Sequence, residues 1–84
     1  MYKIYKYELK LEDQQSLVLP EHSKILTVIE QNNKIVLYAQ VTNSKYYDNY
    51  TIFVRGTGHS INESALYLNT VKIGMFVWHI FYKK

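Results

Sequence analysis

The chain has 84 residues, the length of one domain, and it contains no cysteine. A chain of this length buries only about 60–65% of the surface that it exposes when unfolded, and no disulfide can strengthen so thin a core. The formal net charge of +3 falls short of the dense basic patch of a DNA-binding domain. We therefore predict a single domain over residues 1–84 that does not recognise a DNA sequence.

We expect no signal peptide, because lysines stand where the apolar segment of a signal would lie. The longest strongly apolar run, residues 75–82, is far shorter than the ~20 residues of a membrane helix. We therefore expect a cytoplasmic protein with no membrane partner. Because a thin core without disulfides is often completed by association of subunits, we also expect a homo-oligomer.

The first elements have the alternation of β-strands. Residues 2–9 place Tyr5, Tyr7 and Leu9 on one face, which predicts a strand. Residues 15–19 form a predicted short edge strand that Pro20 stops, since proline cannot donate a hydrogen bond to a neighbour.

Residues 24–42 predict a β-hairpin, since two apolar runs flank Asn32-Asn33 and asparagine tolerates the positive φ of a two-residue turn. This register places Leu26 opposite Ala39 and Ile29 opposite Val36. The apolar face that it predicts contains Leu26, Val28, Ile35, Leu37, Ala39 and Val41. The reverse face is mixed and half-buried, which favours a partner subunit or a covering segment.

The second half continues this pattern. Residues 43–50 are expected to form a polar loop, residues 51–55 a strand, and residues 56–65 a long loop with at most one short helical turn near 60–65, capped by Ser60 or Asn62. The apolar phase changes between Leu68 and Val71, which predicts a bulge near residues 69–70. Gly74 turns the chain into a last strand at 75–82, which is apolar on both faces like a central or interface strand.

These elements predict an all-β fold, either a small antiparallel sheet or a partly open barrel of about six or seven strands. Arg55-Gly56-Thr57-Gly58-His59 follows the strand at 51–55 and is the first candidate site. Glycines let backbone N–H groups approach an anion, and arginine can clamp it. The spacing matches neither a P-loop nor a dinucleotide fingerprint, so an ordinary tight turn is the alternative.

Three histidines and no cysteine give no close metal-binding spacing, so we expect no metal and no cofactor. His79, next to Trp78 in the last strand, is expected to be a hydrogen-bonded structural residue. Ser60, His59 and Glu63 are close in sequence, but closeness in sequence is not the geometry of a catalytic triad. We therefore expect no enzymatic activity.

Aromatic side chains form the second candidate cluster. The loop tyrosines suit an interface or the stacking of a base, whereas most other tyrosines are expected to cover the sheet. The predicted ligand-binding residues are Arg55, Gly56, Thr57, Gly58, His59, Tyr46, Tyr47 and Trp78.

Four short segments, taken in their order along the chain, form a pattern. They are Ile4-Tyr5-Lys6-Tyr7-Glu8-Leu9, Leu19-Pro20-Glu21 before Lys24-Ile25-Leu26, Gly56-Thr57-Gly58-His59, and Phe76-Val77-Trp78-His79. In this order they resemble a family of short phage-encoded proteins of unassigned function. The resemblance implies a phage protein that acts in the bacterial cytoplasm, and it supplies no catalytic residue.

Three functions follow as alternatives. The first is a counter-defence protein that sequesters a small anionic, nucleotide-derived immune signal. The second is an inhibitor that binds a host or defence protein, as an anti-CRISPR protein does, through a strand edge or the tyrosine loop. The third is a structural phage protein without a ligand.

Overall fold

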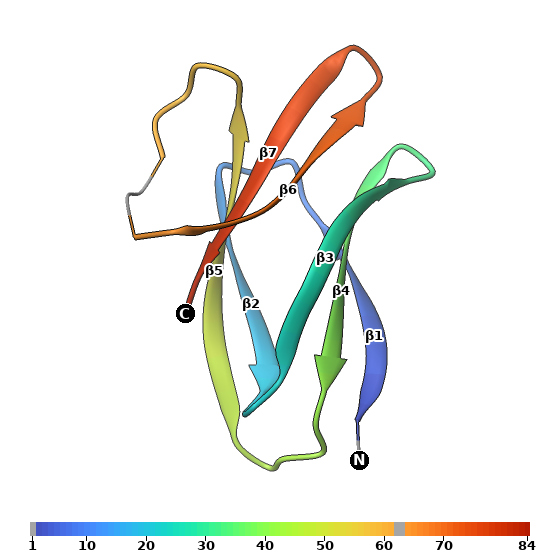
Figure 1. Cartoon of the computed structure of the whole chain (residues 1–84), viewed down its shortest axis with the longest axis vertical. Coiled ribbons are helices and arrows are strands. Elements are labelled where there is room, and N and C mark those ends of the chain that lie inside the picture. Colours follow the sequence, from blue (N-terminus) through green and yellow to red (C-terminus); the bar gives the residue numbers. More distant parts are fainter. Residues whose placement is uncertain (1, 62–63) are drawn as a thin grey trace.

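Figure 1 shows the computed structural model of the chain, which describes residues 2–61 and 64–84. The described residues form strands and no helix, so the predicted all-β class is confirmed. The strands are β1 (Lys3–Leu9), β2 (Gln14–Pro20), β3 (Lys24–Gln31), β4 (Lys34–Val41), β5 (Tyr47–Gly56), β6 (Leu66–Ile73) and β7 (Phe76–Lys83). The predicted helical turn near 60–65 includes Asn62 and Glu63, which lie outside the described residues.

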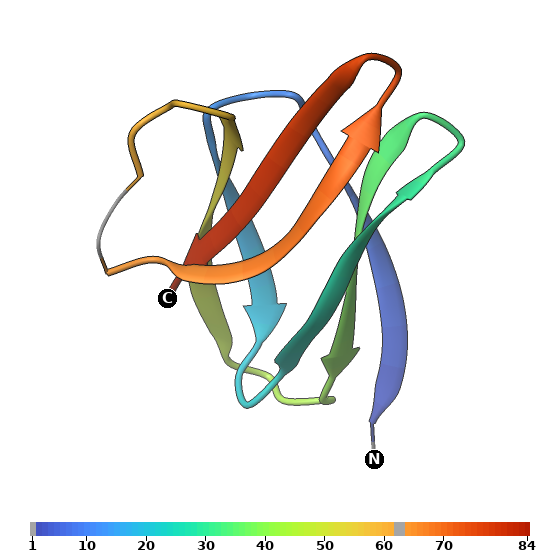
Figure 2. The ribbon, with the colours of Figure 1, turned by 45° about the horizontal axis from the view of Figure 1, so that its top comes forward.

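The strands form two open antiparallel sheets. One has the order β1-β4-β3 and the other the order β2-β5-β7-β6. The edge strands β3 and β6 lie against each other (Figures 1 and 2), and Asn69 Nδ2 donates a hydrogen bond of 2.7 Å to the carbonyl oxygen of Val28 there. The opposite edges, β1 and β2, have no comparable contact. The two sheets are therefore joined along one side and open along the other.

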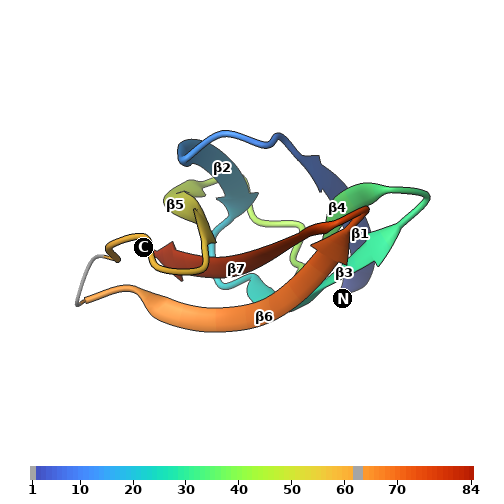
Figure 3. The same cartoon turned by 90° about the horizontal axis from the view of Figure 1, so that it is seen from above.

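The core lies between the two sheets, which Figure 3 shows from above. Because side chains alternate along a strand, each sheet turns every second residue toward the other sheet. The buried residues of this cluster are Leu9, Leu19, Val28, Ile35, Leu37, Ala39, Val41, Tyr50, Ile52, Val54, Val71 and Ile80. The core is thin, and the molecule measures only 16 Å along its shortest axis.

The predicted hairpin is confirmed, but its outer register is wrong by one residue. Asn32 and Asn33 have φ values of 54° and 63°, and Val28 lies opposite Leu37 as expected. A bulge between Ile25 and Thr27 then places Ile25, and not Leu26, opposite Ala39. Ile25 packs against the core, whereas Leu26 is 40% exposed. The bulge keeps an apolar side chain on the inner face after the register shifts.

The predicted polar loop at 43–50 is too long. β5 begins at Tyr47 and pairs with β2, so that Tyr50 lies opposite Leu17. Tyr50 is buried in the core, where its ring lies 6.2 Å from that of Tyr82. The first part of β5 lies beside an edge strand and needs only one apolar face. Polar residues lie between its tyrosines, so the sequence of this part has the composition of a loop.

Several further predictions are confirmed. β2 is an edge strand, and β7 is a central strand between β5 and β6. A register shift lies between Tyr67 and Asn69, close to the predicted bulge, and Gly74 has a φ of 59° in the turn before β7. The expectation of a half-buried reverse face on the hairpin also has a local basis, because Val36 is buried within this one chain while Ile29 is exposed.

The bulge can be tested with two neighbouring truncations. We expect Ile25→Ala to lower the free energy of unfolding by about 1–3 kcal/mol, because it removes side-chain atoms that pack against the core. Leu26→Ala should cost less than about 1 kcal/mol, because its side chain faces solvent. Urea unfolding of both variants checks this, and a larger cost for Leu26→Ala would contradict the bulge.

Candidate functional site

The Arg55 side chain is held by backbone carbonyl groups. Its Nε donates to the carbonyl oxygen of Ser60 at 2.9 Å, and one terminal nitrogen donates to the carbonyl oxygen of Asp13. The guanidinium carbon also lies 5.2 Å from the ring centre of Phe53. Val54 N donates to the same Asp13 oxygen at 3.1 Å. Arg55 thus ties the β1–β2 connection and the loop after β5 to the sheet.

The glycine-rich run that follows Arg55 closes on itself. His59 N donates to the carbonyl oxygen of Gly56, and Gly56 N donates to His59 Nδ1, each at 3.1 Å. A Cβ atom on residue 56 would lie 3.1 Å from the His59 ring, so the ring leaves little space for a side chain. Gly58 has a φ of 91°, a conformation that glycine adopts without strain. Each glycine therefore has a structural reason in this turn.

A chain of side-chain hydrogen bonds lies beside this run on the outer face of its sheet. His79 Nε2 is 2.9 Å from Thr57 Oγ1, and His79 Nδ1 is 3.0 Å from Thr70 Oγ1. Tyr67 OH extends the chain at 2.6 Å from Thr70 Oγ1. The expectation of a hydrogen-bonded His79 is confirmed. A hydroxyl group, and not a carboxylate, faces Nδ1, so it lacks the charged partner that stabilises an imidazolium in a catalytic triad.

The structure separates the predicted ligand-binding residues. Tyr47 and Gly56 begin and end β5, so nine residue steps of a strand, about 30 Å, lie between them. Tyr46 lies just before β5, at the end of the strand that is far from the Arg55 loop. Trp78 lies directly opposite Gly56 in the β5–β7 pair, but its side chain packs against the core on the face of β7 opposite His79. The run from Arg55 to His59 and Trp78 therefore lie at one end of β5, and Tyr46 and Tyr47 lie at the other.

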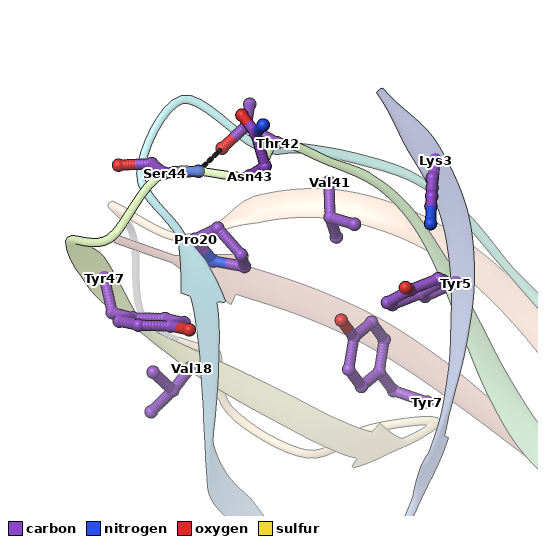
Figure 4. A pocket seen from close by; sticks show the side chains of 10 residues that line it. All are labelled: Lys3, Tyr5, Tyr7, Val18, Pro20, Val41, Thr42, Asn43, Ser44 and Tyr47. Carbon is purple, nitrogen blue, oxygen red and sulfur yellow. Dashed lines mark hydrogen bonds between the residues drawn. The ribbon is translucent and has the colours of Figure 1, made fainter. Parts of the chain in front are cut away.

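A cleft of about 550 Å³ lies along the open side of the molecule, between β1 and β2 (Figure 4). We call it the tyrosine cleft. Tyr5 and Tyr7 project into it from β1, and Tyr47 borders it at the start of β5. Its remaining lining residues are Lys3, Val18, Pro20, Val41, Thr42, Asn43 and Ser44. Ligand pockets in proteins typically measure about 300–1,000 Å³, so the cleft can hold a small molecule.

The cleft combines apolar rings with polar groups that can contact a ligand. Among the described residues, the hydroxyl groups of Tyr5, Tyr7 and Tyr47 have no hydrogen-bond partner. Burial, with a smaller effect of the neighbouring Tyr5, raises the pKa of Tyr7 above its usual value. Like any tyrosine at neutral pH, Tyr7 is protonated and can donate a hydrogen bond. Lys3 supplies a cation at the end of the cleft.

Sequence reasoning missed Lys3, Tyr5 and Tyr7 as site residues, although it placed the two tyrosines on one face of a strand. The sequence does place residues 3, 5 and 7 on one face of a strand, and all three are polar or amphipathic. This pattern does not identify a binding site, because a strand that only covers a core shows the same alternation.

Within the described part of the chain, no three His, Asp or Glu side chains gather as a metal site would require. Residues 2–61 and 64–84 also contain no helix long and apolar enough to cross a membrane.

Replacing Arg55 measures its structural role. We expect Arg55→Ala to lower the free energy of unfolding by about 1–3 kcal/mol, because three backbone carbonyl oxygens lose a charged donor. Lys72→Ala, which removes an exposed cation from β6, is the control and should change stability by less than about 0.5 kcal/mol. If Arg55→Ala is as stable as the wild type in urea, its hydrogen bonds are not structural.

Titration of Tyr7 tests the environment of the tyrosine cleft. The absorbance of tyrosinate near 295 nm should show one transition, lost in Tyr7→Phe, that lies above the usual pKa of about 10. Because the pKa is raised in the folded state, the stability linked to Tyr7 is present below about pH 10 and is lost as the pH rises through the folded-state value. A lost transition at or below about pH 10 would contradict the burial of Tyr7.

Comparison with known proteins gives a family and no function. Neither the proteins of curated function nor the solved structures include a match to the chain. One family model matches residues 1–84, and its description is a domain of unknown function, DUF7352. Because this match covers the whole sequence, the chain belongs to the DUF7352 family.

Proposed function

We propose that this chain is a phage accessory protein that acts by binding and holds a small, anionic, nucleotide-derived molecule in the tyrosine cleft. The observation that carries the proposal is the grouping of Tyr5, Tyr7 and Tyr47 with Lys3 around one cleft of about 550 Å³. The resemblance of four ordered segments to short phage proteins supports the phage context. A nucleotide-binding cleft and a phage context together fit a counter-defence role, in which the protein removes an immune signal from the bacterial cytoplasm.

The chemistry of the cleft suits a nucleotide. A tyrosine ring stacks on any base, and each such contact contributes about 1–3 kcal/mol to binding. Tyr5 is 49% exposed, so its ring is accessible from solvent. The ammonium group of Lys3 attracts a phosphate as a point charge, without the fixed two-point geometry of an arginine. This combination of rings and one cation favours the binding of aromatic anions as a class, without selecting one particular base.

The tyrosine cleft supports this role better than the Arg55 loop does. Arg55 already donates to three backbone carbonyl oxygens, those of Asp13, Val54 and Ser60, and an anion bound there would have to compete with these bonds. His59 Nδ1 already accepts a hydrogen bond from Gly56. The loop from Arg55 to His59 remains a candidate anion contact, and the experiment below distinguishes it from the cleft.

A second candidate is inhibition of a host or defence protein. Tyr46 and Tyr47 are 73% and 63% exposed at the start of β5, and the neighbouring strand β2 has a free edge. Exposed tyrosines are frequent at protein interfaces, and a free edge can accept an additional strand. This candidate predicts a protein that stays bound during purification and no bound nucleotide.

The proposal can be tested by thermal unfolding with mononucleotides and with linear and cyclic di- and trinucleotides. A ligand at one hundred times its dissociation constant should stabilise the protein by about 2.7 kcal/mol and raise its melting temperature. We expect Tyr5→Ala combined with Lys3→Ala to weaken that ligand at least tenfold, because stacking and charge are both lost.

Two controls locate the site. Tyr67→Ala removes an exposed tyrosine from the outer face of the other sheet and should leave binding unchanged. Arg55→Lys keeps the charge but loses the forked donor geometry. Loss of binding in Arg55→Lys, with normal binding in the Tyr5 and Lys3 variant, would place the ligand at the loop. If none of these nucleotides raises the melting temperature, the proposed ligand class is wrong.

A further inference from the structure

Strand β1 is a free sheet edge that exposes apolar side chains on both faces. It pairs with β4 on one side only, and Figure 2 shows it at the outer edge of its sheet. Ile4 is 65% exposed on one face and Tyr5 is 49% exposed on the other. Proteins usually protect such an edge by charged side chains such as lysine, by proline, by a bulge or by a covering segment. β1 has no proline, its pairing with β4 is regular from Lys3 to Leu9, and its charged residues, Lys3, Lys6 and Glu8, are of both signs.

We propose that two copies of this chain associate through β1, which pairs with the partner's β1 in antiparallel orientation about a two-fold axis at Tyr7. The two three-stranded sheets then form one continuous sheet of six strands. This proposal does not depend on the proposed ligand, because it rests on the strand edge and its charge pattern.

The alternation of β1 restricts the register. Tyr5, Tyr7 and Leu9 belong to the inner face, and a continuous inner face requires residues of equal parity to lie opposite each other. The two-fold axis must therefore pass through a residue and not between two residues. An axis at Lys6 pairs Lys6 with itself, and an axis at Glu8 pairs Glu8 with itself, so both create a like-charge contact that is unfavourable between directly opposed residues.

An axis at Tyr7 instead pairs each Lys6 with Glu8 of the partner subunit. Two equivalent contacts of opposite charge then lie on the outer face. Glu8 also has a cation in its own chain, because Lys34 Nζ lies 3.4 Å from Glu8 Oε1. Lys6 has no ion pair among the described residues, so the contact across the axis gives this lysine a carboxylate. An axis at Tyr5 pairs Lys6 with Ile4 and gives no such contact.

The same register extends the apolar inner face. Tyr7 lies opposite Tyr7 of the partner subunit, and Tyr5 lies opposite Leu9 of the partner subunit. Directly opposed residues have Cβ atoms about 4.5–5.5 Å apart, so the partner's side chains cover part of the exposed Tyr5 ring. The second copy therefore supplies side chains beside the tyrosine cleft.

Charge exchange at residues 6 and 8 tests the proposal. We expect the wild type to be a dimer in sedimentation velocity at about 100 μM. Lys6→Glu and Glu8→Lys should each raise the dissociation constant about tenfold or more, because two attractive contacts become repulsive. The double variant Lys6→Glu/Glu8→Lys should restore the dimer, and an equimolar mixture of the two single variants should form a heterodimer.

Lys72→Glu, which reverses an exposed charge on β6, is the control and should remain a dimer. Circular dichroism checks that each variant is folded. A monomeric wild type, or a dimer that resists both single charge reversals, would overturn the proposal. In the latter case the copies associate through another surface.

A second measurement reports the register directly, since the chain has no native cysteine. Tyr7→Cys places two thiols opposite each other at the axis and should form an intermolecular disulfide under mild oxidation. Tyr5→Cys places its two thiols four residue steps apart, about 13 Å, which is too far for a disulfide. Faster cross-linking of Tyr5→Cys would exclude an axis at Tyr7.

Discussion

The contact between β3 and β6 is the constraint on which the rest of the molecule depends. It joins the two sheets along one side, where Asn69 donates a hydrogen bond to the carbonyl oxygen of Val28. The strands form two sheets, β1-β4-β3 and β2-β5-β7-β6, and the β1 and β2 edges do not pair with each other. The free edges of β1 and β2, and the cleft between them, follow from this one-sided closure.

The open side concentrates the groups that suit recognition. Tyr5, Tyr7 and Tyr47 line the cleft, and the regular edge of β1 lies beside it. The loop from Arg55 to His59, in contrast, directs its hydrogen bonds into its own chain. A small ligand and a second copy of the chain can therefore use adjacent parts of one surface, because the cleft lies between the sheets while pairing of β1 extends a sheet sideways.

Much of the fold could be predicted because strand alternation and turn chemistry are local. The residue types at Asn32-Asn33 and Gly74 predict two turns. The bulge at Leu26 could not be predicted, because one extra residue leaves the apolar composition of the strand unchanged. The cleft could not be predicted, because no local pattern shows that β1 and β2 border the same opening. The residue types from Arg55 to His59 suit an anion site, but they also suit the tight turn that this segment forms.

Distances between paired spin labels test the one-sided closure most directly, and the absence of native cysteine makes labelling straightforward. One pair, at Lys6 and Ser16, spans the open side, and a second pair, at Ile29 and Lys72, spans the joined side. Dilution with unlabelled protein separates distances within one chain from those between copies. We expect a broader distance distribution across the open side than across the joined side. Equally narrow distributions, or a broader one across β3 and β6, would contradict it.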